Sequence, residues 1–178
     1  MHTEVHMRDS VVQVISFLLI LAAAISLIIG CKNSSPQYTA ITENDVMTIM
    51  NEVQKATLAK DLDGVINHLA PFVVINVSMM GSTEPTFMPQ QIQMTRDQYK
   101  EELKKVFSKL TLHEYKREND KITISDDKRS AITETDVIEV MVIDGKETRT
   151  TTHERTVLEI IDGKLVVTHL DAVIVNRE

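Results

Sequence analysis

The hydrophobic pattern of the chain changes abruptly near residue 31. Residues 11–30 carry no charged side chain and hold only three polar ones. A charged start, an apolar run and a small final residue form the pattern of a secretory signal peptide, whether the chain starts at Met1 or at Met7. An uncleaved membrane helix is the alternative, because about 20 apolar residues can cross a bilayer.

Beyond residue 41, apolar residues first recur at the three- and four-residue spacing of an amphipathic helix. This spacing predicts three helices, over residues 42–56, 62–69 and 95–110. Thr42 and Thr95 each precede, by three residues, a side chain that can complete a capping box. A single strand is predicted over residues 72–77, which are mainly β-branched and apolar.

From residue 111 onward the period becomes two, which indicates strands. The alternating segments lie near residues 111–118, 120–125, 130–143, 146–160 and 164–176. Asp-Gly pairs at 144–145 and 162–163 predict hairpins, so the last three strands should form an antiparallel meander. We therefore expect an α+β domain, in which three N-terminal helices pack on the concave face of a strongly curved antiparallel sheet that forms a cone.

One segment, residues 79–94, has no periodicity at all. It contains four methionines, two prolines, a glycine and a phenylalanine. Long loops of compact domains often act as lids or binding segments, and flexible methionines suit an adaptable apolar surface. One interpretation places Met79, Met80 and Phe87 against a ligand. The other is a loop packed on the core, with its methionines filling gaps.

The end of the first apolar run resembles the lipobox of bacterial lipoproteins, in the order Ile28-Ile29-Gly30-Cys31. The resemblance implies diacylglyceryl transfer to the Cys31 thiol, cleavage before it and acylation of the new N-terminus. Residues 1–30 would then be a signal peptide, 31–41 the lipidated cysteine and a polar tether, and 42–178 the folded domain. Two or three acyl chains would hold the protein firmly in a membrane, since one chain alone binds marginally.

The lipobox resemblance also predicts the location and one partner of the protein. The chain would be exported and anchored to a bacterial membrane, with membrane lipid bound through Cys31. In a Gram-negative host, a residue other than Asp after the cysteine, here Lys32, would favour the outer membrane, facing the periplasm.

Composition narrows the choice of chemistry. The formal net charge is −7, and it stays negative without the signal peptide, so a nucleic-acid partner is not expected. Cys31 is the only cysteine, which leaves the folded part without a disulfide, a thiol nucleophile or a cysteine metal site. Beyond the predicted signal peptide no H-x-x-x-H or H-x-H spacing is present, so we expect no metal and no cofactor.

The order of elements resembles the nuclear transport factor 2-like superfamily, including its SnoaL-like (polyketide-cyclase-like) members, over residues 41–175. The stretches that carry the resemblance are AKDLDGVINHLAP (59–71), TRDQYKEEL (95–103) and DGKETRTTTHERTVLEIIDGKLVVTHLDA (144–172). The resemblance implies a ligand cavity between the curled sheet and the helices. Members include isomerases, dehydratases, cyclases and binding modules, and many dimerise through the open sheet face, so a homodimer through the sheet is expected here.

Candidate site residues lie on the last strands and on the third predicted helix. His169 and Asp171 alternate with Leu165 and Val167, and a His beside a carboxylate could transfer protons if this face is concave. Otherwise the pair would hydrogen-bond to neighbouring strands.

On the preceding strand either Glu154 or Arg155 should line the cavity, depending on the alternation. Tyr99 lies on the apolar face of the third helix and is a further pocket candidate. The preferred hypothesis is a lipid-anchored domain that binds a small apolar ligand or a protein partner. The alternative is a general acid–base enzyme, an isomerase, dehydratase or cyclase, with His169 and Asp171 as its proton-transfer pair.

Overall fold

The computed structural model describes residues 37–79, 91–143 and 145–177. The chain divides into two units, Met1–Ser35 and Pro36–Glu178, and every element described below belongs to the second. The predicted signal peptide, Cys31, Met80 and Phe87 lie outside the described residues. Within the described ranges no helix combines the length and the apolar character that a membrane crossing needs.

Three helices precede or interrupt the strands of the described domain: α2 (Glu43–Ala59), α3 (Leu62–Ile66) and α4 (Arg96–Lys109). The predicted capping box at the start of α2 is confirmed. The Asp45 backbone N–H donates to Thr42 Oγ1 at 3.2 Å, and the Thr42 N–H donates to Asp45 Oδ2 at 2.9 Å. These two bonds satisfy N–H groups that the first turn of a helix leaves without partners.

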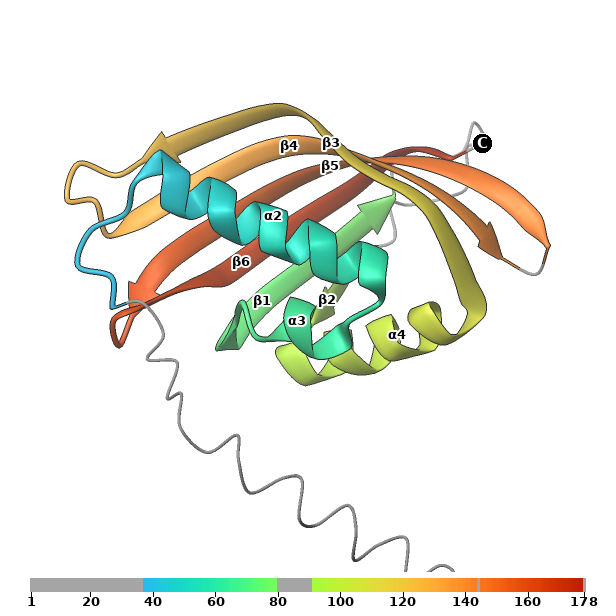
Figure 1. The fold of residues 1–178 in the computed structure, drawn as a ribbon, viewed down its shortest axis with the longest axis horizontal. Helices are drawn as coiled ribbons and strands as arrows, with labels where there is room; N and C mark the ends of the chain where they lie inside the picture. The colour runs from blue at the N-terminus through green and yellow to red at the C-terminus, as the bar shows by residue number, and fades with distance from the viewer. Residues whose placement is uncertain (1–36, 80–90, 144, 178) are drawn as a thin grey trace, which may run out of the picture. The chain divides into compact units, whose positions relative to one another are not determined.

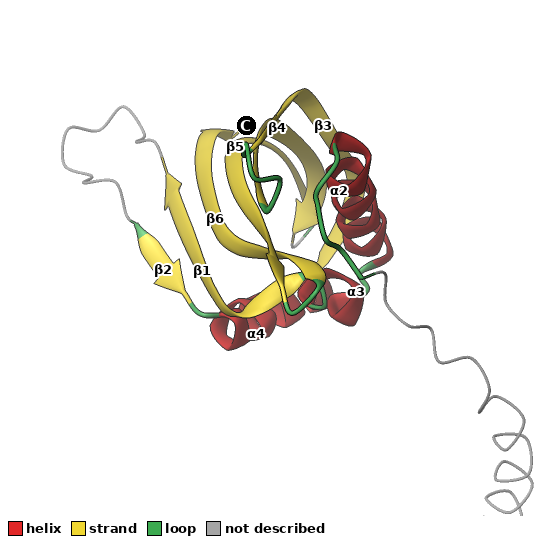
Figure 2. Cartoon of the chain, turned by 90° about the vertical axis from the view of Figure 1, so that its left-hand side faces the viewer, coloured by secondary structure: helices red, strands yellow, loops and turns green. Residues whose placement is uncertain are grey.

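The described strands form one curved sheet in the order β2-β1-β6-β5-β4-β3 (Figures 1 and 2). Their bounds are β1 Leu69–Met79, β2 Ile92–Met94, β3 Leu110–Ile124, β4 Ser130–Ile143, β5 Lys146–Ile161 and β6 Lys164–Arg177. Strands β4 to β6 form the predicted antiparallel meander, and β3 adds a further antiparallel strand beside β4. The α+β class with a curved sheet is therefore confirmed.

One strand pair departs from the all-antiparallel prediction, because β1 runs parallel to β6. Parallel neighbours require a long crossover connection, and here α4 and the meander provide it. The sheet is thus mixed. The short strand β2, which pairs with the end of β1, was not predicted, since its three residues lie in the aperiodic segment.

The second helix is shorter than predicted. It ends at Ile66, and Leu69 already belongs to β1, where it pairs with Val167. Pro71 therefore lies within a strand and does not end the helix. The pairing of β1 with β6 is irregular between Leu69 and Val74, and a proline is tolerated where the strand ladder is interrupted.

A buried aliphatic core joins the helices to the inner face of the sheet, which we define as the face that α2 and α4 cover. Val46 and Ile49 of α2 are buried together with Ile75 of β1 and Leu158 of β5. Figure 2 shows the helices on one side of the curved strands. The opposite side, which we call the outer face, carries no helix among the described residues.

Strand β3 replaces the two strands predicted over 111–118 and 120–125. The break predicted between them is a β-bulge at Asn119, whose φ is +58°. Pairing with β4 shifts between Glu118 and Lys121, so the alternation of side chains is reversed beyond the bulge. As a result Arg117, before the bulge, and Asp120, after it, lie near each other, with Arg117 Nη2 3.9 Å from Asp120 Oδ2.

Candidate functional site

A cavity of about 290 Å³ lies between the helices and the inner face of the sheet. Its apolar wall combines α2 (Ile49, Met50, Val53), α4 (Leu103, Val106, Phe107) and the sheet (Ile75, Val77, Leu158, Val167, Leu170, Ala172, Ile174). These residues lie far apart in the sequence, and the curvature of the sheet brings them together around one cavity. A mainly apolar concave site with few polar groups is typical of small-molecule binding.

Five ionisable side chains converge on this cavity. They are Tyr99 of α4, Tyr115 and Arg117 of β3, Glu139 of β4 and Glu154 of β5. Three neighbouring strands and one helix thus each contribute at least one group. We call this set the inner polar cluster.

Glu154 is the most perturbed acid of the inner polar cluster. Burial in the cavity wall and the nearby Glu139 carboxyl raise the pKa of Glu154 to about 7, while the charge of Arg117 opposes the rise. A carboxyl with such a pKa is present in both protonation states near neutral pH. It can therefore donate or accept a proton, which a surface glutamate cannot do there.

The other acid and the two tyrosines of the cluster are shifted by the same cause. Burial raises the pKa of Glu139, and a hydrogen bond from Thr150 Oγ1 at 3.4 Å opposes the rise. Burial raises the pKa of Tyr99 and of Tyr115 as well, and the acids Glu154 and Glu139 add to the effect. Both phenols stay neutral at physiological pH and can donate hydrogen bonds into the cavity.

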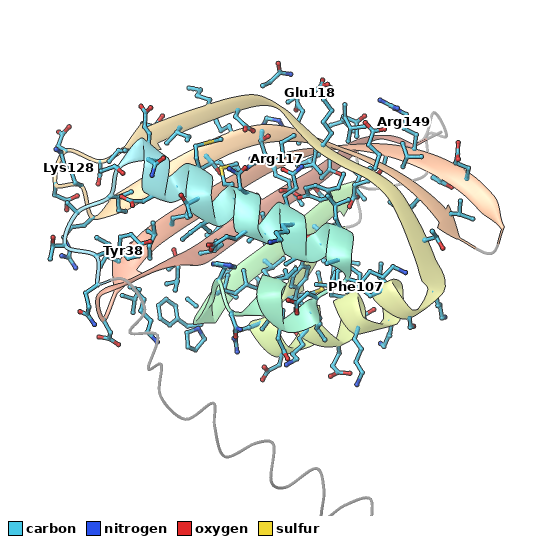
Figure 3. All side chains as sticks on the ribbon, viewed as in Figure 1. Tyr38, Phe107, Arg117, Glu118, Lys128 and Arg149 are labelled. Atoms are coloured by element: carbon cyan, nitrogen blue, oxygen red, sulfur yellow. The ribbon has the colours of Figure 1, made fainter. Side chains whose placement is uncertain are left out.

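Arg117 is the cationic member of the inner polar cluster, and only part of its hydrogen-bonding capacity is used. Its side chain is only 8% exposed. Nη2 donates to Asn51 Oδ1 of α2 at 2.7 Å, but Nε and Nη1 are buried without a hydrogen-bond partner among the described residues. Figure 3 shows Arg117 on the side of β3 that faces α2, and its neighbour Glu118 on the opposite side.

The structure places two of the predicted pocket residues at the cavity. Glu154 and Tyr99 line it, and Arg155 takes the opposite side of β5, where its Nη1 lies 3.8 Å from Asp171 Oδ2. The open choice between Glu154 and Arg155 is thereby decided. Met79 is the last residue of β1, and its side chain lies outside the described part of the structure, as do Met80 and Phe87.

Of the two alternatives for His169 and Asp171, the structure shows hydrogen bonding to a neighbouring strand, and neither residue lines the cavity. Only the face that they were expected to share with Leu165 and Val167 was wrong. Pairing between β5 and β6 shifts at a bulge, where Val157 faces His169 and Leu158 faces Val167. The extra residue, Thr168, reverses the alternation, so Leu165 and Val167 do not share a face with the two polar residues. A bulge of this kind leaves no signal in the hydrophobic pattern.

His169 and Asp171 instead form a hydrogen-bonded group on the outer face. Asp171 Oδ1 lies 2.8 Å from His169 Nε2 and accepts from Asn76 Nδ2 at 2.8 Å. Gln93 Nε2 donates to Asn76 Oδ1 at 3.2 Å and extends the group to β2. Burial favours a raised pKa for Asp171, but the hydrogen bonds from Asn76 and His169 outweigh it and lower that pKa.

Sequence reasoning did not identify Arg117, Tyr115 and Glu139 as members of the site. The outer positions of β4 are largely apolar (Ile132, Ile138, Val140, Val142), whereas Glu139 shares the inner face with Thr133 and Thr135. Alternation alone therefore indicates the wrong face of this strand. Arg117 could have been found only with the strand order and the register shift of β3 between Leu112 and Glu114 known.

The described residues offer no protein site for a metal ion. Across these ranges no group of three or more His, Cys, Asp or Glu side chains is arranged to hold one. The ionisable groups that the cavity wall itself supplies are a carboxyl that titrates near neutrality, a second carboxyl, two phenols and a guanidinium.

No family model and no curated protein matches this sequence. Solved structures do match. A nuclear transport factor 2-like protein from Cytophaga hutchinsonii aligns over 76% of this chain and 100% of its own, with 12% identity and a TM-score of 0.60. A candidate scytalone dehydratase from Novosphingobium aromaticivorans covers 76% of this chain and 85% of its own, with 11% identity and a TM-score of 0.59.

A ketosteroid isomerase-like protein from Erwinia carotovora atroseptica matches similarly, over 74% of this chain and 94% of its own, with 13% identity and a TM-score of 0.57. At such low identity these matches describe the fold alone. They confirm that the chain has the nuclear transport factor 2-like fold, as the order of its elements predicted. They leave the activity to be argued from the cavity.

Proposed function

We propose that this chain is an exported, membrane-anchored lipoprotein whose nuclear transport factor 2-like domain binds a small, largely apolar organic molecule. The observation that carries the proposal is the cavity of about 290 Å³, with an apolar wall and the inner polar cluster within it. At roughly 30 Å³ for each non-hydrogen atom, this space holds about ten such atoms. That is the size of a short-chain lipid fragment or a small aromatic compound.

The binding proposal can be tested by blocking the cavity. Ala172 lines it on β6, and the next residue, Val173, does not. The full-length protein is purified from its native host in three forms, wild type, Ala172→Phe and the matched control Val173→Phe, and small molecules that remain bound are measured by mass spectrometry. We expect a bound organic molecule in the wild type and the control and its loss from Ala172→Phe. Equal ligand content in all three would contradict the proposal.

The anchor is a separate part of the proposal and rests on the sequence around Cys31. Metabolic labelling with a fatty acid should modify the wild-type protein and leave Cys31→Ala unlabelled, because that variant lacks the thiol that accepts diacylglycerol. The labelled protein should also partition with membranes. Equal labelling of both proteins would overturn the anchor and would leave the binding proposal intact.

A second candidate function, general acid–base catalysis, is favoured by one observation. The carboxyl of Glu154 has a pKa of about 7 and faces the cavity, which suits a proton-transfer group at neutral pH. Two structural neighbours carry enzyme names, a candidate scytalone dehydratase and a ketosteroid isomerase-like protein. In this version Glu154, and not the outer His169, would abstract and return the proton.

Isotope exchange separates catalysis from simple binding. The wild-type protein, with the molecule that co-purifies with it, is incubated in heavy water, and deuterium at carbon is followed by NMR. An enzyme that acts through Glu154 incorporates deuterium, and Glu154→Gln does not. Retention of the ligand by both proteins without any exchange would identify a binding domain.

We also propose that two copies pair through the outer face of the sheet. Outer positions of β4 carry half-buried aliphatic side chains (Ile132, Ile138, Val140, Val142), and no described helix covers them. Val140→Lys should shift a dimer to a monomer in analytical ultracentrifugation. A wild-type protein that sediments as a monomer would contradict this pairing.

A further inference from the structure

The unsatisfied guanidinium of Arg117 is the feature of the cavity that the binding proposal has not used. The side chain is more than nine-tenths buried, and two of its three nitrogens, Nε and Nη1, have no partner among the described residues. Buried donors are normally paired, and an arginine cannot lose its charge to relieve the cost. A buried cation that lines a cavity with free donors is therefore arranged for an acceptor that is not part of this chain.

The protein groups around Arg117 leave two of its nitrogens without a hydrogen bond. Asn51 is uncharged and binds Nη2, and Asp120 forms a long ion pair with the same nitrogen, with Oδ2 3.9 Å away and beyond hydrogen-bond distance. The other oxygen of Asp120 accepts from Thr135 Oγ1 at 2.5 Å. No ion pair joins Arg117 to Glu139 or Glu154 in the described structure, although all three line the cavity.

We propose that the ligand of this cavity is an amphipathic organic anion, a carboxylate on a short apolar body, and that Arg117 binds the carboxylate. This inference rests on the proposed binding function and names its ligand class. The aliphatic wall receives the apolar body, and Arg117 in the lining supplies charge-assisted hydrogen bonds to the head group once its unpartnered Nε or Nη1 turns toward the ligand. A neutral molecule of the same size offers only an uncharged acceptor, whose hydrogen bonds are weaker.

The protonation state of Glu154 should regulate this binding. Glu154 is faced by Glu139 from β4, by Arg117 and Tyr115 from β3 and by Tyr99 from α4, and α2 contributes no ionisable side chain to the wall. When Glu154 is protonated, the cavity carries one negative charge fewer, which favours an anion beside Arg117. When Glu154 ionises, its carboxylate repels the ligand, so binding should weaken as the pH rises through about 7.

A pair of probes of equal size tests the ligand class. Octanoate and octanamide each have about ten non-hydrogen atoms, the number that the cavity holds at roughly 30 Å³ per atom. Both are titrated by calorimetry into the full-length protein in lipid nanodiscs, with empty nanodiscs as the blank. We expect octanoate to bind at least about ten-fold more tightly than octanamide, because hydrogen bonds to charged groups are the stronger ones.

Two arginine variants test whether Arg117 causes the preference for octanoate over octanamide. Arg117→Met should reduce the octanoate-to-octanamide preference to about one and keep octanamide binding, which shows that the cavity is intact. Arg96→Met is the matched control. Arg96 also has a buried Nε without a described partner, but it does not line the cavity, so the preference should stay unchanged.

Each outcome decides between the two proposals. Equal binding of both probes by the wild type, or an unchanged preference in Arg117→Met, overturns the anion inference and leaves the apolar-ligand proposal standing. If neither probe binds, both proposals fail. In a last arm, octanoate affinity of the wild type should fall several-fold between about pH 6 and about pH 8.5, and that of Glu154→Gln should stay constant. A constant wild-type affinity overturns the role of Glu154.

Discussion

The two faces of the sheet carry similar polar residues but pair them differently. On the outer face, Asp171 is held by Asn76 and His169 at 2.8 Å each. On the inner face, Arg117 and Glu154 line one cavity, and the described structure shows no ion pair between them and no hydrogen-bond partner for two nitrogens of Arg117. Paired polar groups stabilise the fold, whereas unpaired groups around a cavity are available to a ligand.

The direction of the pKa shifts follows the same division. On the outer face the pKa of Asp136 is lowered by hydrogen bonds from Asn119 and His153. On the inner face the pKa of Glu139 and that of Glu154 are raised, mainly by burial. The outer face thus carries a carboxylate whose charged form is stabilised by hydrogen bonds, and the cavity carries carboxyls whose charged form is destabilised by burial. Carboxyl groups with raised pKa values are typical of functional sites.

The largest expected effect on stability comes from removing the buried carboxylate of Glu154. Glu154 has a pKa of about 7 in the folded protein, against 4.5 for an unperturbed glutamate. The folded state therefore binds the proton more tightly, and stability falls as the pH rises from about 4.5 to about 7, by up to roughly 3 kcal/mol. Glu154→Gln should remove this loss, so that the variant is more stable than the wild type above pH 7.

Urea unfolding at about pH 5 and about pH 8.5 measures this effect. We expect the free energies of unfolding of the two proteins to be similar at the lower pH and to differ by about 2 to 3 kcal/mol, in favour of Glu154→Gln, at the higher one. The variant should also lose the pH dependence of octanoate binding. A variant that is less stable than the wild type at both pH values would show that the Glu154 carboxylate is satisfied in the cavity.

Local features of the fold were predictable from the sequence because they depend on neighbouring residues. The Thr42 capping box and the two Asp-Gly hairpins each need only a few consecutive side chains. The fold class followed from the order of these elements. The parallel pairing of β1 with β6 did not, because it joins segments nearly one hundred residues apart, such as Asn76 and Asp171.

The site was only partly predictable, because irregularities in strand pairing decide which side chains reach the cavity. The bulge at Thr168 moves His169 and Asp171 to the outer face, and the register shift of β3 between Leu112 and Glu114 precedes Tyr115 and Arg117, which line the cavity. A one-residue bulge reverses every later side chain on its strand and leaves the composition unchanged. Glu154 was predictable as one of two options, because no bulge separates it from Leu158 of the core.

A smaller effect on stability is expected from disrupting the hydrogen-bonded group of Asp171 on the outer face. Asp171→Asn should cost about 1 kcal/mol of stability or less, because the side chain is one-third exposed and solvent screens its charge. The lowered pKa of Asp171 stabilises the fold above its ordinary pKa, and this contribution is lost as the pH falls through the lowered value. The loss in the variant should therefore be seen at pH 7 in urea unfolding.

The same variant tests whether the outer group has a role in the cavity. Octanoate affinity of Asp171→Asn should equal that of the wild type, because Asp171 does not line the cavity. A clear drop in affinity without a drop in stability would mean that the two faces are coupled, and the comparison between them would fail. His169→Gln provides a second variant of the same group with the same expectation.

The smallest effect is expected at Glu134, an outer glutamate on the strand that also carries Glu139. Its Oε2 accepts from Lys121 Nζ at 3.0 Å, and the Lys121 hydrogen bond and charge lower its pKa. The stability that this shift represents has the opposite sign to that of Glu154, since it is present above the ordinary pKa and lost at lower pH. Exposed pairs contribute little, so Glu134→Gln should leave unfolding at about pH 8.5 unchanged within error. If Glu134→Gln stabilised the protein as much as Glu154→Gln does, the gain would come from reduced net negative charge. The destabilisation assigned to the buried Glu154 carboxylate would then be refuted.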